Sequence, residues 1–128
     1  MIQFDDRIDA RSPTPLYAQI ANRVKLAIAS GELRVGDGLP SVRHLASQLR
    51  VNPATVVQAY RELEAEGFVK TRHGAGTFVG EVDSGMRQRE RSREARRLVR
   101  ELIADAVSLG LSPNELLTAL RAEIGGAE

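Results

Sequence analysis

Apolar residues recur at intervals of three and four positions in five stretches of this chain, which is the spacing of helices that bury one face. Before the first stretch, Thr14 can cap a helix and Pro15 can occupy its first position. Gly31 is expected to end this helix, and Arg23 and Lys25 are expected at its surface. Its apolar stripe consists of Leu16, Ile20, Val24, Ala27 and Ile28.

Two shorter helical patterns meet at a tight turn. Ser41 follows Pro40 and can cap a helix that ends near Arg50. Asn52 is a second cap, and Pro53 suits the first position of the next helix because its missing N–H costs nothing there. A connection of about three residues is typical of a helix-turn-helix. The two apolar stripes are Val42, Leu45, Ala46 and Leu49, and then Val56, Ala59, Tyr60 and Leu63.

A β-hairpin is expected directly after the second of these helices, which Gly67 can terminate. Residues 68–72 and 77–79 are rich in β-branched and aromatic side chains, and a glycine-containing turn joins them. Leu39 is expected to add a short strand edge beside this hairpin. The order of elements predicts a winged helix, which can hold one helix in a DNA groove while a loop reaches the next groove.

The chain after the hairpin begins with a polar segment that is rich in arginine. Ser84 and Gly85 predict a hinge, and seven arginines with only two glutamates follow between Arg87 and Arg100. Such a run is common on a solvated helix face, and its position after the wing also allows contact with DNA. We favour the solvated face, with a modest contribution to DNA binding.

Two apolar stripes then predict a pair of helices. The first is expected from Ala95 to Gly110, and Ser112 can cap the second, which starts at Pro113. Two short helices cannot bury these stripes well alone, so we expect pairing with a second copy of the chain. The expected dimerisation residues are Leu98, Val99, Leu102, Ile103, Ala106, Leu116, Leu117 and Leu120.

Composition narrows the range of functions. A chain of 128 residues suits one domain of ordinary size, or one small domain with an appendage, and the absence of cysteine excludes disulfides and thiolate chemistry. The acidic first residues and the lack of a long apolar run argue against a signal peptide and a membrane span, so we expect a cytoplasmic protein. His44 and His73 lack the spacing of metal motifs, and no nucleophile constellation is present, so we expect no enzyme, metal or cofactor. The net charge of +1 by itself would not indicate DNA binding.

Four motifs resemble, in order and without gaps, the DNA-binding domain of the GntR family of bacterial transcription regulators. The resemblance covers roughly residues 14–80, and it is similar in detail to the short YtrA-like branch and to the aminotransferase-fused MocR-like branch. A chain of this length favours the short branch. The motifs are Leu39-Pro40-Ser41-x-Arg43-x-Leu45-Ala46, Val51-Asn52-Pro53-x-Thr55-Val56, Leu63-Glu64-x-Glu66-Gly67 and Gly74-x-Gly76-Thr77-Phe78-Val79.

The fold class that follows is mainly α with a small β-hairpin. The resemblance implies a winged helix-turn-helix at residues 1–80, with an N-terminal arm at 1–13, and a C-terminal two-helix dimerisation region at 81–128. The implied function is a dimeric repressor that binds an inverted-repeat operator in double-stranded DNA. The alternative is a winged-helix module that binds protein and not DNA. A small-molecule effector of unknown identity could bind between the terminal helices.

The candidate DNA contacts begin with Arg43, which matches an arginine of the family and could bond a guanine edge or a phosphate. The alternative for this side chain is a surface ion pair with Glu62 or Glu64. The family often has a basic residue where this chain has Pro53, so base reading should depend less on arginine. The full candidate set is Arg43, Asn52, Ala54, Thr55, Val57, Gln58, Lys70, Arg72, His73 and Gly74.

Each further candidate has a stated chemistry. Thr55 suits phosphate, Gln58 an adenine edge and Val57 a thymine methyl group. In the wing, Lys70 and Arg72 would attract phosphate, and the glycine tip would let the backbone approach a minor-groove wall. A hairpin of this composition could also be purely structural. Tyr60 and Phe68 are expected in the core rather than against bases.

Overall fold

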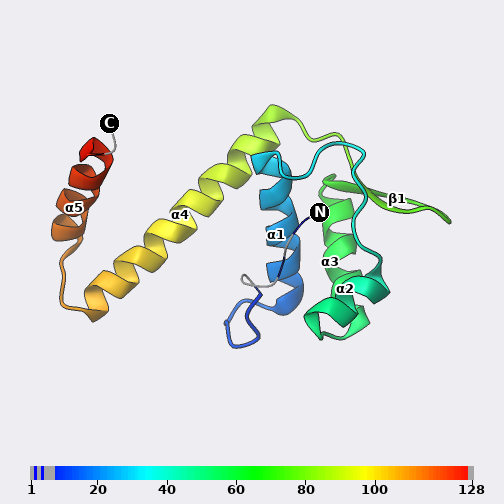
Figure 1. Ribbon diagram of the computed structural model, residues 1–128, viewed down its shortest axis with the longest axis horizontal. Coiled ribbons are helices and arrows are strands. Elements are labelled where there is room, and N and C mark those ends of the chain that lie inside the picture. Colours follow the sequence, from blue (N-terminus) through cyan, green and yellow to red (C-terminus); the bar gives the residue numbers. More distant parts are fainter. Residues whose placement is uncertain (1, 3, 5–7, 127–128) are drawn as a thin grey trace. The chain divides into compact units, whose positions relative to one another are not determined.

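The computed structural model describes residues 2, 4 and 8–126, and these contain five helices and one two-stranded hairpin (Figure 1). The mainly helical fold with a small hairpin is confirmed. The chain falls into two compact units, Met1–Arg91 and Ser92–Glu128. The elements are α1 (Leu16–Ser30), α2 (Val42–Leu49), α3 (Pro53–Ala65), β1 (Val69–Arg72), β2 (Gly76–Val79), α4 (Ser84–Ser108) and α5 (Pro113–Gly126).

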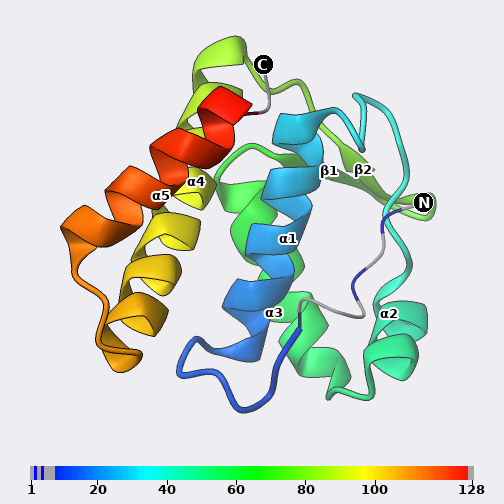
Figure 2. The same ribbon diagram turned by 60° about the vertical axis from the view of Figure 1, so that its left-hand side comes forward.

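Helices α1 and α3 pack together at the centre of the first unit, and α2 packs on α3 (Figures 1 and 2). The predicted stripes form this core, and a fully buried aliphatic side chain such as Ile20 or Leu63 contributes about 1.5–3 kcal/mol. Ile2 and Phe4 of the expected arm are buried in the same core. Residues 1, 3 and 5–7 of that arm lie outside the described residues.

The start of α1 differs from the prediction. Pro15 has an extended backbone (φ −55°, ψ 147°), the helix begins at Leu16, and no side chain caps it. Gln19 binds the incoming chain instead: its amide nitrogen donates to the carbonyl oxygens of Thr14 and Asp9, each at 2.8 Å, and its amide oxygen accepts from the Asp9 N–H at 2.7 Å. The predicted cap by Thr14 is therefore wrong, because the extended Pro15 holds Thr14 away from the first turn.

The expectation that Arg23 and Lys25 stay at the surface is also wrong. Lys25 is 4% exposed, its Nζ lies 2.7 Å from a carboxylate oxygen of Glu66, and it lies 5.6 Å from the ring centroid of Phe68. The largely buried Arg23 donates to both carboxylate oxygens of Glu32, each at 3.1 Å. Long aliphatic stems let such residues lie over a core while the charged end meets a partner.

The two caps of the helix-turn-helix are confirmed. The Ser41 hydroxyl oxygen accepts from the His44 N–H at 3.1 Å, and the Asn52 side-chain oxygen accepts from the Ala54 N–H at 2.9 Å. The buried Tyr60 of α3 donates its hydroxyl to the carbonyl oxygen of Pro40 at 2.7 Å, and burial raises the pKa of this phenol. One side chain thus joins α3 to the segment that leads into α2.

The hairpin is antiparallel, with Val69 opposite Val79 and Arg72 opposite Gly76. Each strand bound lies within one residue of the prediction. A third segment joins the hairpin, because Gly38 forms a bridge to Phe78 and the Leu39 N–H donates to the Thr77 carbonyl oxygen at 2.8 Å. The expected strand edge is therefore confirmed.

The segment after the hairpin is helical from Ser84 onward, so the predicted hinge at Ser84 and Gly85 is wrong. The Asp83 carboxylate accepts from the Met86 N–H at 2.8 Å and caps the first turn, which stabilises helix through Gly85. Helix α4 therefore starts well before the expected Ala95.

The turn that follows α4 agrees with the prediction. Gly110 has a φ of 82°, and Ser112 and Glu115 form reciprocal side-chain to backbone hydrogen bonds of 3.1 Å at the start of α5. Figure 2 shows α5 running back from this turn.

Candidate nucleic-acid interface

The first turns of α3 present one covered and one open side. Val56, Ala59, Tyr60 and Leu63 lie in the core, as predicted. Among the candidate contacts, Asn52, Ala54 and Gln58 are exposed, and Thr55 and Val57 are half-buried. Because Asn52 satisfies the Ala54 N–H, it acts as a cap and stays at the surface. The open side of α3 can therefore offer hydroxyl, amide and methyl groups to a ligand.

Helix α2 adds a cationic side chain beside this surface. Arg43 is exposed on its first turn. Among the residues that the structure describes, Arg43 forms no ion pair with Glu62 or Glu64, and a Glu64 carboxylate oxygen accepts from the Thr71 N–H at 2.8 Å instead. The guanidinium of Arg43 thus keeps its hydrogen-bonding capacity for an incoming group.

The wing carries a basic face. Lys70 and Arg72 alternate along β1, so their side chains leave the hairpin on one face, with Phe78 of β2 directly opposite Lys70. The guanidinium carbon of Arg72 lies 5.3 Å from the centroid of the Phe78 ring, which is cation–π distance. Sequence reasoning missed the role of Phe78 as a platform for Arg72, although the alternation of side chains in the two strands places both on one face.

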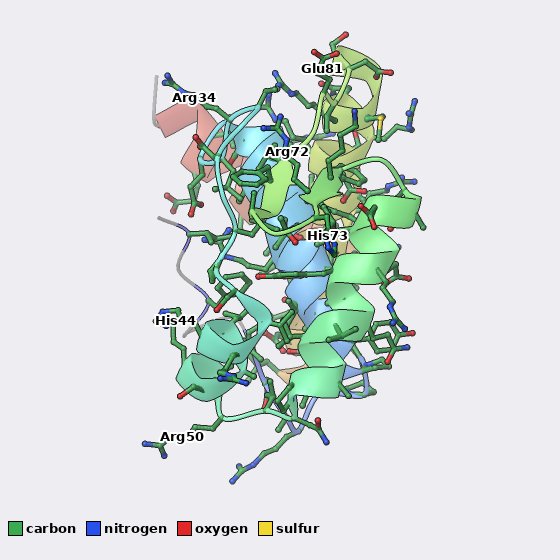
Figure 3. The ribbon with its side chains drawn as sticks, turned by 90° about the vertical axis from the view of Figure 1, so that its right-hand side faces the viewer. Arg34, His44, Arg50, Arg72, His73 and Glu81 are labelled. Carbon is green, nitrogen blue, oxygen red and sulfur yellow. The ribbon has the colours of Figure 1, made fainter. Side chains whose placement is uncertain are left out.

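The tip of the wing extends beyond this platform. Arg72, His73 and Gly74 are exposed, and the Arg72 carbonyl oxygen accepts from the Ala75 N–H at 3.0 Å to close the turn. Gly74 has a φ of 78°, which favours glycine. Figure 3 shows Arg72 and His73 on the hairpin, with Arg34 on the segment that leads to Gly38, where the chain joins the hairpin.

Basic side chains outside the predicted set lie on the same unit. His44 and Arg50 are exposed near the two ends of α2 and point outward (Figure 3). Sequence reasoning assigned them no function, since exposed polar residues on a short helix carry little signal by themselves. The structure does single out Arg50, because its backbone has a positive φ of 57°.

The arginine run lies on α4. Arg87, Arg91 and Arg100 are all exposed, as expected for a solvated helix face. Arg97 donates hydrogen bonds to the carboxylates of Glu94 and Glu101 along the helix, and its hydrogen bond to Glu94 is the main cause of its raised pKa.

The second unit leaves much of its apolar surface uncovered. No described residue of α5 is buried. Ala106 differs from the other candidate dimerisation residues because it is buried within the single chain, where its carbonyl oxygen accepts from the Leu109 and Leu111 N–H groups of the turn. Ile103 and Leu116 are half-buried. The exposed candidates are Leu98, Val99, Leu102, Leu117 and Leu120.

Two searches of the described residues bear on other kinds of site. They contain no group of three or more His, Asp or Glu side chains that could hold a metal ion. None of their helices combines the length and apolar character that crossing a bilayer requires.

Comparison with known proteins identifies the family. Residues 16–79, which span α1 to β2, match the family described as bacterial regulatory proteins, gntR family. The chain is 38% identical over 110 residues to the HTH-type transcriptional repressor YtrA of Bacillus subtilis (strain 168), covering 86% of this chain and 85% of that protein. The chain belongs to the GntR family.

Solved structures of GntR-family proteins have a similar fold. A GntR family transcriptional regulator from Listeria monocytogenes has a TM-score of 0.66 and 31% identity, over 89% of this chain and 97% of that one. The GntR-family transcription factor YtrA from Sulfolobus acidocaldarius has a TM-score of 0.56 and 39% identity, over 79% of this chain and 95% of that one. These similarities confirm the winged helix and the resemblance to the YtrA-like branch.

Membership of the GntR family defines the general function of the chain. It is a transcription regulator with a DNA-binding helix-turn-helix. The relatives named above are transcription regulators rather than enzymes.

Proposed function

We propose that the chain is a dimeric repressor that acts in the cytoplasm and binds an inverted-repeat operator, with one α3 helix in each of two major grooves. The observation that carries this proposal is that the chain has both an exposed surface at the start of α3 and an α5 helix in which no described residue is buried. The first supplies a surface for DNA, and the second supplies a surface for another copy of the chain.

The DNA contacts are assigned by chemistry. Arg43 reads a guanine edge or binds phosphate, Gln58 reads an adenine edge and Val57 contacts a thymine methyl group. Thr55 contacts phosphate beside Asn52 and Ala54, since the N–H groups at the start of a helix favour an anion. The side chains on the open side of α3 support this assignment.

The wing contacts the flanking DNA. Lys70 and Arg72 approach phosphate, and His73 and Gly74 reach a minor groove at the tip. Stacking of Arg72 on Phe78 supports this role, because it holds the guanidinium in place before DNA arrives. A preorganised side chain loses less entropy on binding.

Dimerisation would cover the apolar face that α4 and α5 leave open. Leu98, Leu102 and Leu120 are 53%, 44% and 41% exposed in the single chain. Solvent exposure of so many large apolar side chains on α4 and α5 is unfavourable, and a second copy would bury them in a two-fold symmetric interface. Two-fold symmetry in the protein calls for a two-fold symmetric operator.

Repression is the direction of control that the relatives support. The YtrA protein of Bacillus subtilis is named a transcriptional repressor. A dimer bound at its operator would repress by occupying the DNA that the transcription machinery needs.

Selection of bound sites from a pool of random duplex DNA tests this proposal. We expect enrichment of an inverted repeat whose half-sites lie about 10 base pairs apart or at a multiple of that spacing. Enrichment of a single half-site would contradict the dimeric mode of binding. No enrichment would contradict operator recognition and favour a protein-binding role for the winged helix.

A further inference from the structure

Arg50 occupies the turn of the helix-turn-helix in a conformation that its side chain disfavours. Among the described residues, it is the only one other than glycine with a positive φ, at φ 57° and ψ 46°. The left-handed region brings a β-carbon close to the following carbonyl oxygen, so glycine is the usual residue there. The chain therefore accepts a conformational cost at Arg50.

The backbone at this position explains the conformation but not the choice of arginine. The Arg50 N–H donates to the carbonyl oxygens of Ala46 and Ser47, and the Val51 N–H donates to the Ala46 carbonyl oxygen at 3.0 Å. These bonds close the end of α2 as a left-handed cap, and glycine could form all of them. The advantage of arginine must come from its side chain.

No polar contact of the side chain within the described residues offsets this cost. It is exposed, and within the described part of the chain its guanidinium has no hydrogen bond or ion pair. Figure 3 shows it pointing away from α2 and α3 into solvent. An arginine in a conformation that favours glycine, with no polar partner of its own, is a candidate for a functional contact.

The location of Arg50 fits a phosphate of bound DNA. Arg50 lies on the turn just before the Asn52 cap and the exposed start of α3. When the second helix of such a pair enters the major groove, the first helix crosses the sugar-phosphate backbone, which places the connecting turn beside that backbone. A long guanidinium side chain can reach a phosphate from there and bond two of its oxygens.

We propose that Arg50 binds a backbone phosphate at the edge of the groove that α3 enters, and that this contact accounts for an arginine at a position suited to glycine. The inference rests on the proposed mode of DNA binding. It adds a contact that attracts DNA without reading its sequence.

Three variants separate the charge of Arg50 from its backbone conformation. Arg50→Gly removes both the charge and the strain, Arg50→Asn removes the charge in a residue that tolerates the left-handed region, and Arg50→Lys keeps both the charge and the strain. Each full-length protein is titrated with a fluorescein-labelled duplex of mixed sequence at several salt concentrations, and its Tm is measured without DNA. A mixed sequence suits the test because a phosphate contact is independent of base identity.

We expect Arg50→Gly to raise Tm by about 4 °C, because it relieves the strain. The same variant and Arg50→Asn should bind duplex more weakly, with the slope of log K against log salt reduced in magnitude by about 0.9 for each bound chain. Arg50→Lys should keep the slope and the Tm of the wild type. Arg50→Gly should thus raise stability and weaken DNA binding, and these opposite changes distinguish a functional residue from a structural one.

Two results would overturn the proposal, and they differ in what else they affect. A wild-type chain that binds duplex while Arg50→Gly and Arg50→Asn bind with the same affinity and slope would overturn the phosphate contact alone. A wild-type chain that shows no salt-dependent duplex binding would overturn the proposed mode of DNA binding, and this contact with it.

Discussion

Tyr60 joins α3 to the segment that leads into α2 through a single buried hydrogen bond. Its hydroxyl donates to the Pro40 carbonyl oxygen, and both residues are buried. Tyr60→Phe keeps the ring and leaves that carbonyl without a partner. We expect the free energy of unfolding to fall by about 1–2 kcal/mol at neutral pH, as measured by denaturant titration.

The pH dependence of the same variant provides a second test at this residue. Burial raises the pKa of Tyr60 above its ordinary value near 10, so the unfolded chain loses this proton at a lower pH than the folded chain. The stability that Tyr60 contributes is present below about pH 10 and is lost as the pH rises beyond that value. Tyr17 remains in both proteins, so wild type should lose more stability than Tyr60→Phe above about pH 10. Equal losses would contradict the assignment.

Arg43 provides the residue-scale test of base reading. Replacement by alanine should weaken binding to a selected operator by about 1–3 kcal/mol if the guanidinium bonds a guanine edge. Arg121→Ala is a matched control, because it removes an equal charge from an exposed position on α5. A titration in which Arg43→Ala binds as tightly as the control would remove Arg43 from the DNA-binding surface.

At the scale of the elements, Lys25 and Glu66 connect α1 to the end of α3. Glu66→Ala would leave the Lys25 ammonium buried beside Phe68 with no carboxylate. We expect a loss of about 1–2 kcal/mol in the free energy of unfolding, less than for a wholly buried pair, since the Glu66 side chain is 42% exposed.

Two further variants control that prediction. Glu62→Ala removes an exposed carboxylate one turn earlier on α3 and should change stability little. Lys25→Met replaces the buried cation with an apolar side chain of similar length and should be nearly neutral. A Glu66→Ala protein as stable as Glu62→Ala would show that the ion pair contributes nothing.

The elements also show which features of this chain can be read from sequence. The caps at Ser41 and Asn52 were predictable because each depends on groups within three residues. The burial of Lys25 was not, since its partner Glu66 lies on another helix and only the packed core brings them together. The predicted hinge at Gly85 failed because a cap at Asp83 outweighed the low helix propensity of glycine.

Some features of the candidate site could likewise be predicted from the sequence, and others could not. The open side of α3 followed from the period of its apolar residues, so the exposure of Asn52 and Gln58 was predictable. The stacking of Arg72 on Phe78 depends on the register of the hairpin, and the strain at Arg50 depends on the path of the turn. Neither is encoded in a local spacing.

For the whole molecule, the exposed apolar surface of α4 and α5 predicts the oligomeric state. Leu102→Glu places a charge on the proposed interface at a position already exposed in the single chain, so the chain should fold normally and become monomeric in light scattering. Val35→Glu is the matched control, since Val35 is 52% exposed in the first unit. Dimers that persist in Leu102→Glu would place the interface elsewhere.

In the proposed function, two copies of this chain read one operator together. Sedimentation of the protein with a duplex carrying the selected inverted repeat measures this stoichiometry directly. We expect a complex of two chains on one duplex, with no stable complex of a single chain. A complex containing one chain per duplex, or no complex at all, would contradict it.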